Sequence, residues 1–224
     1  MSEEQEIAIK VWDLPVRLVH WALVLLVAFQ VLSASLGERL IDWHMRSGYA
    51  ILALVLFRLL WGVAGSSSAR FARFLVRPAD ALQFAGRLWS RRAPAVAGHN
   101  PIGGWMVVAL LAALLVQVGT GLFSNDGIAS EGPLARLVSG GLSDRITTLH
   151  HWNFRVLLVL ASLHVAAVLY HWRALKEDLI GAMFTGVKRI RDAPPALQFA
   201  SGRRALLLFV LSVAVVWLIV ARPW

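Results

Sequence analysis

The sequence predicts an all-α integral membrane protein with five transmembrane helices. The chain of 224 residues is 58% hydrophobic and 16% charged, whereas a soluble globular domain is nearer half apolar and a quarter charged. Its mean hydropathy is +0.65. Most of the ten Trp residues stand at the ends of apolar runs, where aromatic side chains anchor a helix in the membrane interface. These observations favour a membrane protein over a soluble one.

Five apolar segments are long enough to cross a membrane. A hydrocarbon core of about 30 Å takes roughly 20 helical residues. Asp13 is the expected N-cap of the first segment, and Pro15 is tolerated in its opening turn. The fifth segment is apolar throughout and carries no histidine. The predicted spans are about 14–36, 44–64, 105–123, 148–172 and 205–221.

The basic residues lie in the connections between the spans. The connection 65–104 holds six Lys and Arg residues and the segment 173–204 holds seven, while the other two connections hold at most two each. Because Lys and Arg mark the cytoplasmic side, we expect a bacterial inner-membrane protein with its N-terminus inside and its C-terminus outside. The two basic segments are expected to form short helices at the lipid headgroups. This arrangement argues against nucleic-acid binding despite a net charge of +9.

The chain has no cysteine. This excludes cysteine-ligated iron–sulfur clusters, a thiol nucleophile and the covalent attachment of c-type haem. There is also no glycine-rich dinucleotide motif after a strand. Any metal or haem must therefore be held by His, Met or oxygen ligands, and no catalytic residue is predicted.

Histidines within the spans are the main functional signal, because an ionisable side chain there marks a functional site by default. With the N-terminus inside, His20 and His164 lie at an inner level, and His44 lies at an outer level with His150 or His151. At 100° per residue, His150 and His164 share a helix face to within about 40°. His151 points about 140° away from His164. The predicted pairs are therefore His20 with His164 and His44 with His150.

Two imidazoles that face each other at one depth can be the axial ligands of a six-coordinate haem in a bundle core. Ligation by two histidines leaves no iron position for oxygen or substrate, which favours electron transfer. Zinc or copper would need three or four ligands around one point, and two levels about 20 Å apart do not provide them. For His20 alone, a plain interhelical hydrogen bond is an equal alternative.

Three other histidines are expected to lie outside these pairs. His151 and His171 are expected to snorkel at the two membrane surfaces. His99 precedes the third span on the cytoplasmic side. It is expected to be a loop or cap residue, with the border of a quinone pocket as the alternative.

Four arginines are candidate partners of the anionic haem propionates. Arg17 and Arg58 stand at the inner level, and Arg46 and Arg155 flank the outer level. Ordinary snorkelling is an equal alternative for Arg17 and Arg46. Arg58 and Arg155 lie within spans, which favours a buried anionic partner.

Small and polar residues of the second and third spans are candidates for supporting roles. Gln117 and Thr120 are expected to bond across helices. The glycines are expected to give a macrocycle or a neighbouring helix close access, with plain small-residue packing as an equal alternative. They are Gly48, Gly62, Gly119 and Gly121.

Five segments, taken in their order along the chain, resemble the bacterial-type cytochrome b561 family, which includes the b-type cytochrome subunit of nickel–iron hydrogenases. The resemblance covers about residues 11–188 and four of the five predicted spans. It is carried by WDLPVRLVHW (Trp12–Trp21), WHMRSGYAILALVLFRLLWG (Trp43–Gly62), GHNPIGGWMV (Gly98–Val107), TG (Thr120–Gly121) and LHHWNFRVLLVLASLH (Leu149–His164).

The resemblance implies a four-helix bundle that holds two non-covalent b haems. One haem would be ligated from the first and fourth helices and the other from the second and fourth. In this chain these ligands are His20 with His164 and His44 with His150. The bundle would form a domain over residues 1–188, followed by a linker and the fifth helix over 189–224, which lies outside the usual four-helix core.

The resemblance also implies a place in a respiratory chain. Such a protein would exchange electrons between the quinone pool, as ubiquinone or menaquinone, and a periplasmic partner. That partner would be a c-type cytochrome or a dehydrogenase or hydrogenase subunit. Whether the chain forms a homodimer is left open.

Two other functions stay open on the residues alone. A superoxide:quinone oxidoreductase would need a positive patch on the outer face, and the outer loops are neutral to slightly acidic. A non-redox transporter or scaffold would use the histidines to relay protons or to pack. The visible spectrum of the reduced protein would separate the cytochrome from that last class.

Overall fold

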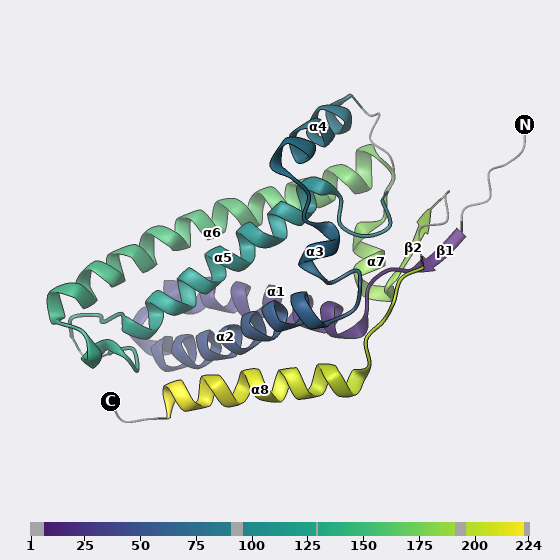
Figure 1. Ribbon diagram of the computed structural model, residues 1–224. Helices are drawn as coiled ribbons and strands as arrows, with labels where there is room; N and C mark the ends of the chain where they lie inside the picture. The colour runs from purple at the N-terminus through teal and green to yellow at the C-terminus, as the bar shows by residue number, and fades with distance from the viewer. Residues whose placement is uncertain (1–6, 91–95, 129, 191–195, 222–224) are drawn as a thin grey trace, which may run out of the picture.

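The computed structural model describes residues 7–90, 96–128, 130–190 and 196–221 (Figure 1). Within these ranges, five helices are long and apolar enough to cross a membrane. This confirms the predicted class, an all-α membrane bundle with a fifth helix at its C-terminal end. The five are α1 (Leu14–Ser35), α2 (Ile41–Ala64), α5 (Pro101–Phe123), α6 (Gly140–Ala174) and α8 (Gly202–Val220).

The first four of these helices form a bundle, and α8 lies along the outside of α2 (Figure 1). The close neighbours are α1 with α2, α2 with α5, and α5 with α6. Helix α6 packs closely on α5 but not on α1 or α2. Large apolar side chains are exposed along the outer faces of the spans, above all on α6 and α8, as expected for helices whose outer surface meets lipid.

Asp13 fixes the start of α1, as predicted. Its Oδ1 accepts a hydrogen bond from the backbone N–H of Val16 at 2.8 Å, and Pro15 stands in the first turn. Its Oδ2 accepts a second bond from Trp61 Nε1 of α2 at 2.9 Å. Both Asp13 and Trp61 are buried. One carboxylate therefore caps α1 and joins it to α2.

One end of the bundle carries a small sheet, and we call it the sheet end. Strand β1 (Ile7–Lys10) pairs antiparallel with β2 (Val187–Ile190), in the register Ile7 with Ile190. The sequence pattern does not predict this sheet, because each strand has only four residues. The expected short helices of the two basic segments are present here as α3 (Phe71–Phe74), α4 (Pro78–Trp89) and α7 (Leu179–Thr185).

The opposite end carries the connection between α5 and α6, and we call it the loop end. Two short 3-10 helices lie there, η1 (Gly37–Leu40) between α1 and α2, and η2 (Ala135–Leu137) between α5 and α6. Helix α6 begins at Gly140, about eight residues before the predicted span. Hydropathy marks only the apolar part of a helix, and the first two turns of α6 are polar. Ser143 in these turns donates to the carbonyl of Phe123 at 2.7 Å, which holds them against the end of α5.

Candidate functional site

The structure brings four histidines of the spans together as two pairs. At the sheet end, the ring centroids of His20 on α1 and His164 on α6 lie 6.4 Å apart, at an interplanar angle of 63°. At the loop end, the centroids of His44 on α2 and His150 on α6 lie 6.5 Å apart, at 72°. All four side chains are partly buried. Helix α6 therefore supplies one histidine to each pair, fourteen residues apart.

The separation within each pair fits a metal ion between the two rings. Bonds of about 2.0 Å on both sides of one ion, with roughly 1.1 Å from each nitrogen to its ring centre, would place the centroids of two opposed imidazoles about 6.2 Å apart. A direct N–H···N hydrogen bond of about 2.9 Å would place them roughly 5.1 Å apart. The observed 6.4 and 6.5 Å match the first case.

The surroundings of the pairs fit a flat cofactor better than a compact metal site. Among the described residues, no group of three or more His, Asp or Glu side chains could hold a metal ion. Helix α6 is also not in close contact with α1 or α2, the helices that carry the partner histidines. Each pair therefore bridges two helices that do not pack on each other, as a macrocycle between them would require.

Polar residues of α5 and α1 orient the loop-end pair. His150 Nδ1 lies 2.9 Å from the carbonyl oxygen of Gln117 and 3.1 Å from Thr120 Oγ1. His44 Nδ1 lies 3.0 Å from Ser33 Oγ. Hydrogen bonds at Nδ1 fix the ring orientation and make Nε2 the candidate ligand atom. The expected cross-helix bonds of Gln117 and Thr120 are thus present, and their partner is a candidate ligand.

Gln117 has a second contact with the same ring. Its Nε2 lies 3.0 Å from His150 Nε2, and its Oε1 accepts from Asn153 Nδ2 at 2.7 Å. If His150 Nε2 held a haem iron, the Gln117 amide would have to give up this hydrogen bond, while the backbone carbonyl of Gln117 could keep its bond to Nδ1.

Two glycines leave room for aromatic rings next to the helices. A Cβ at Gly121 would lie 3.2 Å from His150 Cε1, a tighter contact than side chains normally make. A Cβ at Gly62 would overlap the ring of Phe71. By contrast, a Cβ at Gly119 would meet nothing within 4 Å, and one at Gly48 only Gln30 Nε2 at 3.4 Å. The lack of a side chain at Gly121 thus leaves room for the ring of His150, a candidate ligand. At Gly62 it leaves room for the ring of Phe71.

The sheet-end pair has a different polar environment. Among the residues that the structure describes, buried His20 Nδ1 has no hydrogen-bond partner. The ring of His99, expected in a loop, packs between Trp12 and Phe74, with centroid distances of 4.6 and 4.5 Å. His99 Nδ1 is likewise buried without a partner. Its pKa is lowered to about 3, first by burial and then by the charges of Arg58 and His164.

The two inner-level arginines both reach the sheet end. Arg58 is 7% exposed, and its Nη1 donates to the carbonyl of Ala69 at 3.3 Å. Arg17 is partly buried; it donates through Nη1 to the carbonyl of Phe184, and its Nε has no partner. The expected burial of Arg58 within a span is therefore present.

The two outer-level arginines are exposed. Arg46 lies over the ring of Trp43 at 5.6 Å, and Arg155 lies over the ring of Trp152 at 4.4 Å. For Arg155 this differs from the expected buried anionic partner. Its position one helical turn from Trp152, on a face of α6 that no neighbouring helix covers, explains the difference.

His171 is buried within the protein, so it does not snorkel into the membrane interface as expected. It is 6% exposed, and its Nδ1 lies 2.5 Å from Glu177 Oε2. Its Nε2 lies 3.4 Å from Asn100 Nδ2. Glu177 also pairs with Lys188 of β2 at 2.8 Å. The partners come from three separate segments at the sheet end, so local sequence gave no signal for this cluster. His151, by contrast, is exposed as expected.

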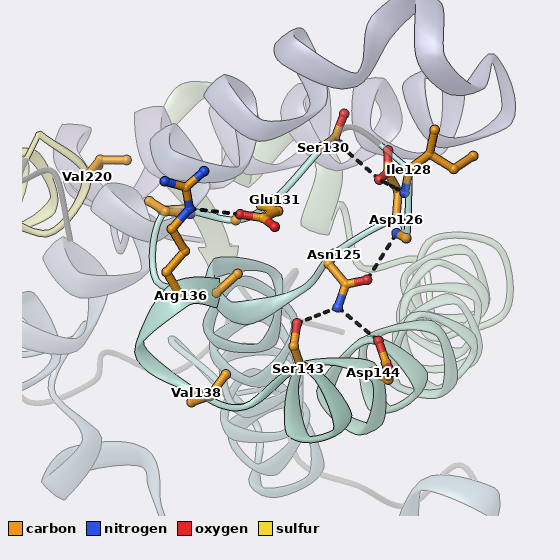
Figure 2. Close-up of a pocket in the computed structure, with 15 residues that line it drawn as sticks. Asn125, Asp126, Ile128, Ser130, Glu131, Arg136, Val138, Ser143, Asp144 and Val220 are labelled. Atoms are coloured by element: carbon orange, nitrogen blue, oxygen red, sulfur yellow. Dashed lines mark hydrogen bonds and ion pairs between the residues drawn. The ribbon is translucent and has the colours of Figure 1, made fainter.

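A polar hollow of about 850 Å³ lies at the loop end, in the connection between α5 and α6 (Figure 2). Figure 2 shows Asn125 donating to Ser143 and Asp144, and Arg136 paired with Glu131. These bonds hold the connection over the start of α6. The hollow is lined by residues of this connection, of the start of α6 and by Val220 at the end of α8, and by none of the four paired histidines.

Comparison with known proteins gives one match. No curated protein and no solved structure matches the chain. Residues 11–186 match the family described as prokaryotic cytochrome b561. The matched range begins after β1 and ends before β2, and it contains both histidine pairs but not α8. Since the match covers more than half of the sequence, the chain belongs to the prokaryotic cytochrome b561 family.

Proposed function

We propose that the protein holds two b haems, one between His20 and His164 and one between His44 and His150, and carries electrons between the two faces of the membrane. Membership of the family makes the chain a membrane cytochrome that binds b-type haem in electron transport. The observation that carries the proposal is the 6.4 and 6.5 Å separation of the two histidine pairs.

The two pairs stand near opposite ends of the bundle, which supports transfer across the membrane. Fourteen residues of α6 at 1.5 Å each separate His150 from His164 by about 21 Å. Haem bound at each pair would supply one-electron redox chemistry. Both axial positions would be filled by histidine, so no iron site would remain for oxygen or substrate. The task of the chain is then to hold and orient its cofactors.

We propose that the electrons pass between a membrane quinone and a redox partner on the periplasmic side. The sheet end would face the cytoplasm, because the basic connections 65–104 and 173–204 lie there. The loop end, with His44 and His150, would face the periplasm. A c-type cytochrome or a dehydrogenase or hydrogenase subunit would exchange electrons there.

A visible spectrum and a haem count test the proposal. The purified protein in detergent should show b-type bands in its reduced-minus-oxidised spectrum, with two haems per chain. His20→Ala and His44→Ala should each retain one haem. His151→Ala is the matched control, because His151 is exposed next to His150, and it should retain both. Absence of b-type bands, or two haems in both ligand variants, would overturn the proposal.

Quinone exchange has its own test. The protein in liposomes should be reduced by added ubiquinol or menaquinol, as followed by the b-type bands. The His20→Ala and His44→Ala variants should each take up fewer electrons per chain than the wild type, because each lacks one of the two haems. If neither quinol reduces the wild-type haems, the quinone part of the proposal fails while haem binding stands.

A further inference from the structure

The buried polar atoms that lack a partner gather at the sheet end. Among the described residues there are four such side-chain atoms, and at the loop-end pair the Nδ1 atoms of both histidines are bonded. Buried polar groups normally have hydrogen-bond partners, so this concentration indicates a polar ligand at the sheet end. The four atoms are Arg17 Nε, His20 Nδ1, Ser68 Oγ and His99 Nδ1.

Arg58 adds a buried positive charge to this region. Its guanidinium donates a hydrogen bond to the carbonyl of Ala69 and stacks on Phe71 at 5.2 Å. Among the described residues, no carboxylate forms an ion pair with it. The nearby Asp13 is occupied by Val16 N and Trp61 Nε1. The charge of Asp13 acts on Arg58 from beyond ion-pair distance. A buried cation without a directly paired anion is costly, so an anionic ligand would be favourable next to Arg58.

His99 is held so that its free nitrogen stays in this region. Its ring is fixed between Trp12 and Phe74. The next residue, Asn100, caps α5 by accepting from Gly103 N at 2.7 Å, which fixes the backbone. Phe74 in turn contacts Phe71, the ring under Arg58, at 5.7 Å. A neutral imidazole can donate one hydrogen bond through Nδ1.

Ser68 supplies a further free donor. Ser68 is 8% exposed, and its hydroxyl has no hydrogen-bond partner within the described part of the chain. The carbonyl that accepts from Arg58 belongs to the following residue, Ala69. The Ser68 hydroxyl therefore lies on the residue next to the carbonyl that binds the Arg58 guanidinium. Together with His99, they offer a cation and two neutral donors.

We propose that Arg58, His99 and Ser68 form a carboxylate-binding site that holds a propionate of the sheet-end haem. This inference rests on the proposed function, since it takes His20 and His164 as the ligands of that haem. An arginine with added neutral donors is a favourable site for a carboxylate, because charge-assisted hydrogen bonds are the stronger ones. The site gives His99 a role that its position before α5 did not indicate.

A redox titration of His99 variants tests the site. His99→Phe keeps an aromatic ring but removes the donor, so the propionate charge is less compensated and the ferric state is favoured. At a fixed potential, the ferrous-to-ferric ratio of the sheet-end haem should fall about tenfold, which corresponds to about 59 mV for a one-electron couple. His99→Gln retains an N–H donor and should recover most of the change. The loop-end haem should not shift.

The controls separate this site from the haem assignment itself. His151→Phe changes an exposed histidine at the loop end and should leave the sheet-end potential unchanged. The sheet-end haem is identified as the one that His44→Ala retains. Absence of haem in the wild-type protein would refute the proposed function. Two bound haems with unchanged potentials in His99→Phe would refute only the carboxylate site.

Ser68→Ala decides the case if His99→Phe does not accumulate as folded protein. It removes one hydroxyl and should shift the sheet-end potential in the same direction by a smaller amount. An unchanged potential in Ser68→Ala would then overturn the proposal. An equal shift in His99→Phe and His99→Gln would also overturn it, because the effect would then come from packing and not from the donor.

Discussion

The Nδ1 atom of His150 lies 2.9 Å from the carbonyl oxygen of Gln117, on a helix that contributes no histidine to either pair. Thr120 Oγ1, one turn further along α5, lies 3.1 Å from the same nitrogen. Its own proton is directed to the carbonyls of Val116 and Gln117, so it accepts from the ring. Helix α5 therefore sets the tautomer and direction of a candidate ligand on α6.

Gly121 should be required for the loop-end haem. In Gly121→Val the added side chain starts 3.2 Å from His150 Cε1 and should push the ring out of line with His44. We expect the affinity for that haem to fall about 10- to 100-fold, as for other changes that disturb the orientation of a ligand. The haem-to-protein ratio after purification and extensive dilution measures the loss.

Gly119→Val is the matched control for this change. It puts the same side chain on the same helix, where a Cβ meets nothing within 4 Å, and it should retain both haems. Equal haem content in the two variants would show that the contact with His150 does not matter for haem binding.

Ser33 should tune the loop-end haem through His44. Its hydroxyl donates to the carbonyl of Gln30 at 3.1 Å and therefore accepts from His44 Nδ1 at 3.0 Å. Ser33→Ala removes this acceptor, makes the imidazole a weaker electron donor and should raise the midpoint potential. The expected rise is on the order of 20–50 mV, which corresponds to part of the free energy of one hydrogen bond.

A redox titration measures this shift, and Ser35→Ala is its control. Ser35 lies two residues further along α1, and its hydroxyl donates only to the carbonyl of Leu32. No shift is expected there. A fall of the potential in Ser33→Ala would contradict the direction of the hydrogen bond.

The arrangement of the four paired histidines follows from helix geometry, and so it is accessible from sequence. Rise per residue converts position into depth, and the 100° turn converts spacing into a face. The N-cap of α1 is equally local, because Asp13 needs only a partner three residues ahead. These features depend on no knowledge of how the helices are arranged.

Features that depend on distant segments could not be predicted in this way. His171 is bonded to Glu177 after α6 and to Asn100 before α5, and Glu177 is in turn paired with Lys188 of β2. Arg155 lies within a span, but its burial depends on which face of α6 meets a neighbour. The pairing of β1 with β2 joins residues about 180 positions apart, and four-residue strands carry little pattern of their own.

Glu177 should stabilise the sheet end. Although burial raises its pKa, hydrogen bonds from His171 and Lys188 together with the Lys188 charge lower it to about 2. Glu177→Gln leaves Lys188, whose side chain is 7% exposed, without its anion. We expect a loss of folding stability on the order of 3 kcal/mol, measured by thermal unfolding in detergent. Glu131→Gln breaks an exposed pair with Arg136 and should cost less than about 1 kcal/mol.

The stabilisation by Glu177 should depend on pH in a defined direction. Its pKa in the folded protein, about 2, lies below the ordinary value of 4.5, so the folded state favours the ionised form. The contribution is fully present above pH 4.5 and is lost as the pH falls toward 2. The difference in melting temperature between the wild type and Glu177→Gln should therefore be constant from pH 8 to 5 and shrink below pH 4.5. A difference that grows on acidification would contradict this assignment.

Helix α8 should be dispensable for haem binding but not for stability. It packs along α2, with Ala205, Ser212 and Val216 buried, and it contributes no histidine. It also lies outside the range shared with the family. A chain that ends at Ala200 should therefore retain two haems and melt at a temperature several degrees lower.

Within the full chain, Val216→Ala should lower the melting temperature more than Val215→Ala, since Val216 is 5% and Val215 38% exposed. Loss of the His44–His150 haem on truncation would show instead that α8 holds α2 in the position that the ligand needs.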